Sequence, residues 1–546
     1  MLTRCYNNFY HNEGGFKMKT SFKKILSLFL SLLMVFSLCS VAFAAEDKTD
    51  LPIIYIAGRS ARVYAPDGTC IYPRSENIEP GFDEVEYTKS IIPEILKALG
   101  ISMVTDDWDL YSDTVYNLIA PLFEQIQLDE NADPEPGTKI AMYPEPKRKT
   151  SNFQLFDYQF QYDWRIDPCL LADELAVYID KVLAATGASQ VEIVGRCLGS
   201  TIVNAYLEEY GDQGKVKNVV FHVPTTAGSM TVGALFSGQV EFNAASLDRY
   251  VAYYMNDTNH RFLDTDDETT MFITAFSAFI TQAQIMGYGA DVLNYVFQKV
   301  RNNLVKRLVR SLFFFPTYWA MIDDTYYEDA KTFVFGEEGS ADRETYKGYI
   351  EKIDNYHYTV QKNYKSTLTR LHDNGMNISV IAKYGGNLLP VNEGCDALAD
   401  GRIETSSLSF GATCSLMHTK LSSSYIEQAK ANGTDKYISA DRKIDASTCL
   451  FPDSTWFVRG LENASFPQSV DNLILFALKH PGQATVWENE SYPQYLDYDP
   501  DTQQISPVTG NSAQDKIWTN DFFRAVFRFL TAFIKLVTKL IGNFAE

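Results

Sequence analysis

Histidine is scarce in this chain, with seven residues in 546 beside 48 Lys and Arg and 69 Asp and Glu. Because imidazole is the commonest general base in enzymes, few positions can supply one. Cysteine is scarce too, at eight residues. No two cysteines have the Cys-x-x-Cys spacing, so neither a zinc site nor any other metal or cofactor is expected. The absence of internal repeats and low-complexity tracts excludes solenoid and fibrous architectures.

The N-terminal segment has the pattern of a secretory signal peptide. Lys19, Lys23 and Lys24 precede the apolar run Ile25 to Phe36, and the segment ends in Ala42-Phe43-Ala44. A retained membrane anchor is the alternative, but the run is short for a span. We therefore expect a secreted or extracellular protein, peripheral to the cell surface membrane if part of it binds lipid.

Acidic residues outnumber basic ones, and the excess grows in the mature chain. Loss of residues 1–44 removes five of the 48 basic and one of the 69 acidic residues, so the net charge falls from −21 to −25. Such a surface repels nucleic acid, which is therefore not an expected partner.

Six cysteines remain in the mature chain, which is expected to enter a compartment where disulfides persist: Cys70, Cys169, Cys197, Cys395, Cys414 and Cys449.

Strand and helix patterns alternate over the first half of the mature chain. Apolar runs at 51–57, 191–194 and 216–223 are typical of strands buried on both faces, and helical periodicity at 171–187 and up to residue 210 separates them. A further helix is expected at 85–99, closed by Gly100. This alternation predicts an α/β fold with a mostly parallel sheet flanked by helices.

The alternation then stops, because residues 227–371 have aromatic-rich helical patterns and no strand signal. We interpret this stretch as an inserted helical cap, after which strand signals return at 378–382 and 455–458 and a helix signal at 469–478. The predicted division is a leader at 1–44, the first core part at 45–226, the cap at 227–371, the second core part at 372–487, an acidic linker at 488–515 and an amphipathic helix at 516–546.

The segment Gly195-Arg196-Cys197-Leu198-Gly199 fits the nucleophile elbow G-x-nucleophile-x-G, between a predicted strand and a predicted helix. The glycines Gly195 and Gly199 are required because side chains two residues from the strained nucleophile would collide. The N–H of Leu198 would point toward a developing oxyanion, and the helix N-terminus would favour a thiolate at Cys197. The alternative is a structural turn that holds a buried cysteine.

Around this elbow the chain resembles the lipases and acyltransferases similar to lecithin:cholesterol acyltransferase, especially their secreted bacterial relatives. The resemblance implies an α/β-hydrolase fold over about residues 51–480, with a lipid or acyl-ester ligand. The motifs that carry it are F-Q-Y-D-W-R from Phe160, G-R-C-L-G, P-T-Y-W-A-M from Pro316, A-D-G-R-I-E-T-S-S from Ala399 and T-W-F-V-R-G-L-E-N from Thr455.

The resemblance implies Asp400 as the catalytic acid, although an Asp-Gly pair is equally typical of a turn. It implies that the base position holds Asn463, where the family has histidine, and that Cys197 stands for the family's serine. An amide cannot accept a proton near neutral pH, so the base position is vacant. A thiol needs less help from a base than a hydroxyl does. His418, in the loop beyond Asp400, is the alternative base.

The resemblance also implies an oxyanion hole formed by backbone N–H groups of Arg59 and Leu198. The segments G-A-T-C and A-S-T-C, which end in Cys414 and Cys449, also resemble the bacterial relatives. We expect a disulfide between these two cysteines rather than free thiols.

The C-terminal residues 520–544 predict an amphipathic helix. Arg524, Arg528, Lys535 and Lys539 fall on one face at helical spacing, and aromatic and aliphatic residues on the opposite face. This pattern is typical of a helix that lies on a membrane surface, and docking on the acidic body is the alternative.

Three functions remain open at this stage. The first is a thiol-dependent ester hydrolase or acyltransferase, the second a catalytically impaired relative that binds a lipid or acyl ligand, and the third a cell-surface interaction protein. Only the first function requires a reactive Cys197. The fold alone does not distinguish the three, because function depends on the site.

Overall fold

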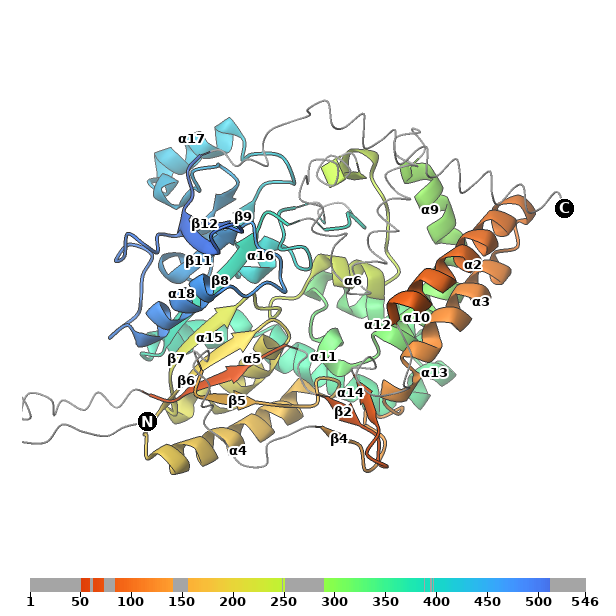
Figure 1. Ribbon diagram of the computed structural model, residues 1–546, viewed down its shortest axis with the longest axis horizontal. Helices are drawn as coiled ribbons and strands as arrows, with labels where there is room; N and C mark the ends of the chain where they lie inside the picture. The colour runs from red at the N-terminus through yellow and green to blue at the C-terminus, as the bar shows by residue number, and fades with distance from the viewer. Residues whose placement is uncertain are drawn as a thin grey trace, which may run out of the picture. The chain divides into compact units, whose positions relative to one another are not determined.

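An eight-stranded sheet forms the centre of the computed structural model (Figure 1). The structure describes residues 51–58, 62–72, 84–140, 156–247, 249–250, 289–386, 388–392, 395 and 397–510. The strand order is β13-β12-β11-β8-β7-β6-β1-β5, parallel throughout except for the antiparallel pair β12 and β13. The strands are β1 (Ile53–Ile56), β5 (Tyr158–Phe160), β6 (Val191–Arg196), β7 (Val216–His222), β8 (Asn377–Tyr384), β11 (Thr455–Arg459), β12 (Tyr495–Asp499) and β13 (Gln504–Pro507).

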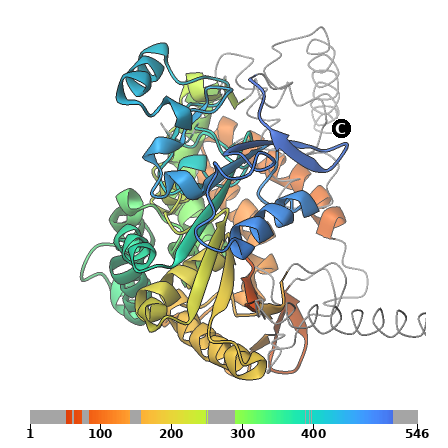
Figure 2. The same ribbon diagram turned by 90° about the vertical axis from the view of Figure 1, so that its left-hand side faces the viewer.

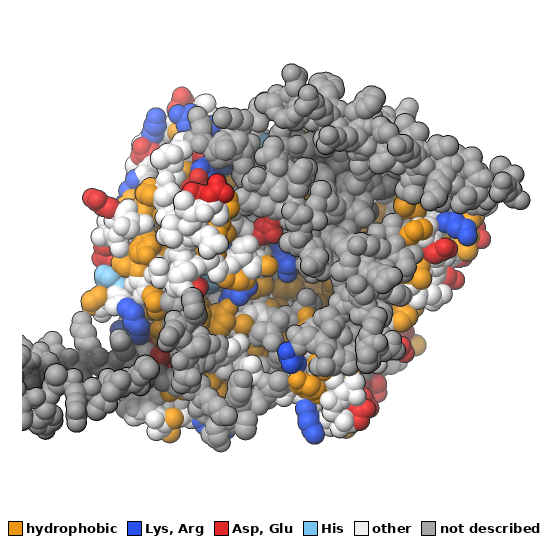
Figure 3. All heavy atoms as spheres, viewed as in Figure 1, with side chains coloured by type: hydrophobic (Ala, Val, Ile, Leu, Met, Phe, Trp, Pro, Cys, Tyr) orange, Lys and Arg blue, Asp and Glu red, His pale blue; other side chains and the backbone are white. Residues whose placement is uncertain are grey.

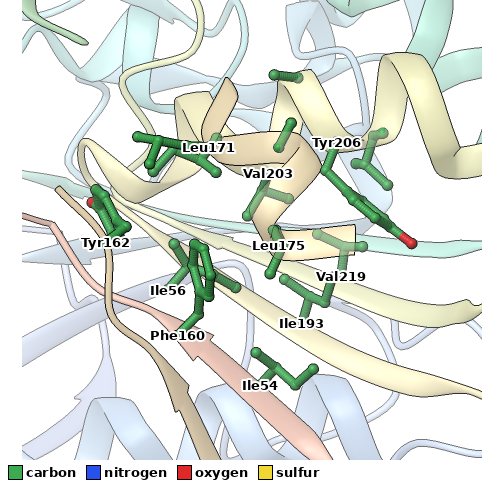
Figure 4. Close-up of a cluster of buried hydrophobic side chains, with 14 of the residues drawn as sticks. Ile54, Ile56, Phe160, Tyr162, Leu171, Leu175, Ile193, Val203, Tyr206 and Val219 are labelled. Atoms are coloured by element: carbon green, nitrogen blue, oxygen red, sulfur yellow. The ribbon is translucent and has the colours of Figure 1, made fainter. Parts of the chain in front are cut away.

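Both faces of this sheet are buried under helices, which explains the continuous apolar runs of its strands. Along β6, Ile193 packs in the cluster beneath α4 (Pro168–Thr186) and α5 (Gly199–Tyr210), whereas Val194 packs on the other face beneath α18 (Gln468–Lys479). Figure 4 shows the first cluster, and Figure 2 shows the helices on the two faces. Each fully buried large aliphatic side chain contributes about 1.5–3 kcal/mol.

The order of the strands reverses between β1 and β6. From β1 the chain goes outward to β5 at the edge, returns to β6 on the opposite side of β1, and then continues through β7, β8, β11 and β12. In open parallel sheets such a reversal leaves a crevice at the carboxyl ends of the two strands. Residues 58 and 197, which follow β1 and β6, lie at this point.

Helices fill the stretch between β7 and β8 within the described residues. They build a second core in which Phe314, Trp319, Phe335 and Tyr349 pack together. The elements are α6 (Met230–Phe236), α9 (Gly289–Val300), η5 (Arg301–Val305), α10 (Lys306–Leu312), α11 (Pro316–Trp319), η6 (Asp324–Tyr326), α12 (Tyr327–Phe335), α13 (Ala341–Thr345), α14 (Lys347–Asn355), η7 (Tyr356–Gln361) and α15 (Tyr364–Asp373).

Two smaller sheets and the remaining helices complete the described elements. The three-stranded sheet β3-β2-β4 (Cys70–Tyr72, Val63–Tyr64 and Lys139–Ile140) precedes β5, and β9 (Thr413–Cys414) pairs with β10 (Ile444–Asp445). The other elements are α2 (Glu84–Thr105), α3 (Trp108–Ile119), η2 (Ala120–Leu122), η3 (Glu124–Ile126), η4 (Gly211–Gln213), α16 (Thr405–Leu408), α17 (Ser423–Asn432), η8 (Asp435–Tyr437), η9 (Ala446–Thr448) and η10 (Pro452–Ser454).

The prediction of an acidic linker at 488–515 is wrong for its central part. Residues 495–507 form β12 and β13, which extend the main sheet beyond β11. Tyr495 and Leu496 are buried there, and the alternating aspartates of Y-L-D-Y-D concealed this short strand.

The helix expected to close at Gly100 continues to Thr105. A glycine inside a helix costs only about 1 kcal/mol, so it need not end one.

The leader at 1–44 and the amphipathic helix at 516–546 lie outside the described residues. Within the described part of the chain, no helix combines the length and apolarity needed to cross a bilayer. On the face in Figure 3, the described acidic and basic side chains are interspersed rather than gathered by sign.

Candidate active site

Cys197 occupies a strained turn between β6 and α5. Its φ is +48°, in the left-handed region that non-glycine residues rarely adopt. Its N–H donates to the carbonyl of His222 (3.1 Å), and the Thr225 hydroxyl donates to its carbonyl (3.2 Å). Because these bonds join the turn to β7 and the segment after it, the thiol is held at the carboxyl edge of the sheet.

The two glycines of the turn lie too close to their neighbours for a side chain. A Cβ on Gly195 would lie 2.8 Å from Val203 Cγ2, and one on Gly199 would lie 2.5 Å from the carbonyl oxygens of both Ile56 and Ala57. Gly199 therefore lets α5 begin directly against the end of β1. A strained residue between two crowded glycines is the geometry that a nucleophile elbow requires.

The electrostatic environment of Cys197 opposes ionisation. Burial raises the pKa of the thiol, and although Arg196 and a hydrogen bond from the Leu198 N–H lower it, the net shift is upward. Asp400 adds to the upward shift. The thiolate expected from the helix N-terminus is therefore not the ground state, because desolvation outweighs the partial charge of the helix end.

We expect alkylation of Cys197 by iodoacetamide to accelerate about tenfold per pH unit from pH 6 to 8 without levelling off, since only the thiolate reacts and its pKa is raised. Cys197 is half-buried as a residue, so a small reagent is expected to reach it although its sulfur is largely desolvated. Peptide mass spectrometry at timed intervals, with Cys197→Ala as control, measures this. A rate that is flat from pH 6 upward would mean a low pKa and contradict the expectation.

Asp400 is a fully buried carboxyl whose two oxygens have separate partners. Oδ1 accepts from the N–H groups of Arg402 (3.0 Å) and Ile403 (2.9 Å), as in an Asp-initiated turn. Oδ2 accepts from Nδ2 of Asn463 at 2.6 Å. Burial raises the pKa of Asp400 and these donors lower it, with a net upward shift. The carboxyl thus belongs to a turn and also orients residue 463.

The contact between Asp400 and Asn463 has the form of the acid–base pair in a catalytic triad. In such triads a carboxylate accepts a hydrogen bond from the base and fixes its orientation. Here the donor to the carboxylate is the side-chain amide of Asn463, and the backbone N–H of Asn463 also donates to the Asp400 carbonyl (2.9 Å). Tertiary contact therefore joins two residues that are 63 positions apart. A side-chain amide can donate and orient, but it cannot accept a proton from Cys197 near neutral pH.

Lys383, at the end of β8, holds the loop that carries Asn463. Its Nζ donates to the backbone carbonyls of Glu462 (3.0 Å), Asn463 (3.1 Å) and Ser465 (2.6 Å). Burial lowers the pKa of this ammonium group to about 7, against the opposing effect of Asp400. Sequence reasoning missed Lys383, although a single charged residue inside the apolar strand 378–384 was the available signal.

The loop after β1 lies against Cys197. A Cβ on Gly58 would lie 3.6 Å from Cys197 Cβ, and the hydroxyl of Tyr162 donates to the carbonyls of Ala57 (2.6 Å) and Gly58 (3.0 Å). Tyr162 therefore fixes this backbone beside the thiol, a role that sequence reasoning did not assign. Arg59, the expected second oxyanion donor, lies outside the described residues.

Two motifs of the sequence resemblance meet behind the site. Arg165 forms a two-point ion pair with Asp163 (2.9 and 2.7 Å), and the Trp164 ring packs edge-on against Phe315 with centroids 5.1 Å apart. The Thr317 hydroxyl also donates to the Trp164 carbonyl. These contacts join the end of the helical insertion to the core and are structural.

The predicted disulfide between Cys414 and Cys449 is absent, and both residues are free thiols. They lie in one buried cluster. Burial raises the pKa of Cys414, and raises that of Cys449 to about 12. Both sulfurs are therefore protonated in this environment, and disulfide formation requires a thiolate.

His418, the alternative base, is an exposed residue with φ +58° in the turn after β9. No set of three or more His, Cys, Asp or Glu side chains in the described ranges is arranged to hold a metal ion.

The mostly parallel eight-stranded sheet, flanked by helices and with its strand order reversing between β1 and β6, has the architecture of an α/β-hydrolase fold. The family model for the alpha/beta hydrolase fold matches residues 148–275, which include β5, β6 and the elbow. The chain therefore has the α/β-hydrolase fold, and the match supports membership of that superfamily. No curated protein matches the chain.

Proposed function

We propose that this chain is a secreted acyl-transferring protein of the lipase and acyltransferase type, an ester hydrolase or acyltransferase with Cys197 as nucleophile. The observation that carries the proposal is the elbow itself, with Cys197 at φ +48° and the Leu198 N–H beside its sulfur. Strain of this kind costs about 1–3 kcal/mol and persists where a function requires it. The Asp400–Asn463 pair further supports a site derived from a triad.

The decisive experiment compares wild type with Cys197→Ala on short- and long-chain p-nitrophenyl esters. The proposal expects p-nitrophenolate release by wild type, a covalent acyl adduct on Cys197 and loss of both in the variant. Because the nitrophenolate leaves readily, this test does not require a general acid. A folded wild-type protein that forms no adduct and releases no product would reject acyl transfer.

A catalytically impaired protein that retains the pocket for a lipid or acyl ligand is the second candidate. It is favoured by the amide at residue 463 and by the raised pKa of the Cys197 thiol. This function predicts saturable binding of a fatty acid by wild type and by Cys197→Ala alike, without any adduct. The same p-nitrophenyl ester experiment therefore separates the two. A cell-surface interaction role, the third possibility, predicts neither result.

The C-terminal residues 520–544 are proposed to attach the protein to anionic membrane surfaces. Residues 516–546 carry five basic and two acidic residues on a chain that is otherwise strongly acidic. Each basic residue near such a surface contributes about 1 kcal/mol, and buried aromatic side chains add to this. Since the described sheet ends at β13, truncation after Asp515 removes no strand of it.

We expect the full chain to sediment with anionic liposomes, more weakly at high salt, and the chain truncated after Asp515 to remain in the supernatant. Co-sedimentation at two salt concentrations measures this, with zwitterionic liposomes as control. Equal sedimentation of both forms would contradict the membrane role of residues 520–544.

A further inference from the structure

Two proton-carrying side chains near Cys197 in the described part of the chain, Asn463 and Lys383, are committed to other partners. Nδ2 of Asn463 donates to Asp400, and an amide has no proton to transfer near neutral pH. Lys383 directs its Nζ to three backbone carbonyls in the loop 462–465. Neither of these two described side chains therefore gives a departing alkoxide the general acid that a triad histidine supplies. Loss of that group costs about 10²- to 10⁴-fold in rate.

The missing acid affects oxygen esters and thioesters differently. When a cysteine sulfur adds to an alkyl oxygen ester, the tetrahedral intermediate contains one sulfur and one alkoxide. A thiol has a pKa of about 8.5, far below that of an alcohol, so the cysteine sulfur is expelled and the starting ester returns. When the donor is a thioester, both leaving groups are thiolates. Neither needs protonation, and exchange proceeds forward.

We propose that the acyl donor for Cys197 is a thioester, and that the product is an S-acyl group on Cys197. The inference rests on the proposed function and specifies its substrate class. In the step, a bond forms from Cys197 Sγ to the acyl carbon, and the bond from that carbon to the donor sulfur breaks. The proton of the Cys197 thiol passes through solvent to the released thiolate, and nothing is oxidised or reduced.

The rest of the site fits this reaction. The Leu198 N–H beside the sulfur would stabilise negative charge on the acyl oxygen. The hydroxyl of Tyr162 fixes the backbone of Ala57 and Gly58 beside Cys197. Hydrolysis of the S-acyl product needs a base to activate water, and residue 463 is an amide. The acyl group therefore stays on Cys197 until a second thiol removes it by the same exchange. The expected kinetics are acylation of one equivalent followed by slow release to water.

The test uses two donors that differ by one atom, S-octanoyl-N-acetylcysteamine and O-octanoyl-N-acetylethanolamine, and p-nitrophenyl octanoate as a third. Intact-mass spectrometry of the full mature chain follows octanoylation, Cys197→Ala controls for the site and thermal melting controls for folding. N-acetylcysteine under the same conditions gives the intrinsic reactivity of each donor toward a thiol.

We expect one octanoyl group from the thioester and from the nitrophenyl ester, and acylation by the alkyl ester at least about 10²-fold slower than by the thioester. Comparable acylation by all three donors would overturn the thioester inference and leave acyl transfer standing. Acylation by the nitrophenyl ester alone would also reject the thioester while keeping the nucleophile. No adduct on Cys197 from any donor would reject the proposed function itself.

Discussion

Replacing Asn463 by histidine is expected to raise hydrolysis of alkyl oxygen esters about 10²-fold, because general acid–base catalysis is worth about 10²- to 10⁴-fold. The amide already donates to Oδ2 of Asp400 at 2.6 Å. An imidazole in its place would keep that bond through one ring nitrogen and present the other for proton transfer. Initial rates on O-octanoyl-N-acetylethanolamine, with wild type alongside, measure the gain.

Two variants make this result specific. Asn463→Ala should show no gain, and Asn463→His combined with Asp400→Asn should lose most of it, because the carboxylate orients the base. The preference for the thioester over the alkyl ester should fall in Asn463→His by the same factor. A folded Asn463→His protein with the wild-type rate would show that residue 463 does not occupy the base position.

Gly199→Ala is expected to have the largest effect on stability, a loss of about 3 kcal/mol in the free energy of unfolding, at the upper end of the range for overpacking. Its Cβ would lie 2.5 Å from the carbonyl oxygens of Ile56 and Ala57. Both are backbone atoms of the central sheet and its first loop, so neither can move aside cheaply. Urea denaturation followed by circular dichroism measures the change.

Gly482→Ala is the matched control, since a Cβ there meets no atom within 4 Å. We expect a change within about 0.5 kcal/mol, as for most surface substitutions. If Gly199→Ala were as stable as Gly482→Ala, α5 would not begin against β1 as described, and the elbow geometry would be in error.

The sequence alone was sufficient for the main strands and for the tight turn between β6 and α5. The strands at 191–196 and 216–222 are apolar on both faces because the sheet is covered on both sides, and that signal is local. The requirement for glycine on both sides of Cys197 is also a local signal, because it arises within the five residues of the turn. The short strand at 495–499 was not predicted because its two aspartates hide the apolar pattern. Its pairing with the buried strand β11 places it in the sheet in spite of them.

What only the tertiary structure decided is how distant groups act on one another. The sequence alone did not bring Asn463 within hydrogen-bond distance of Asp400 or direct Lys383 to the loop 462–465, because these contacts depend on the order of β8 and β11 in the sheet. Nor did it reveal that burial would outweigh Arg196 and the Leu198 N–H at Cys197. Local patterns specify which residues form an element, whereas desolvation and proton transfer depend on what surrounds each group after folding.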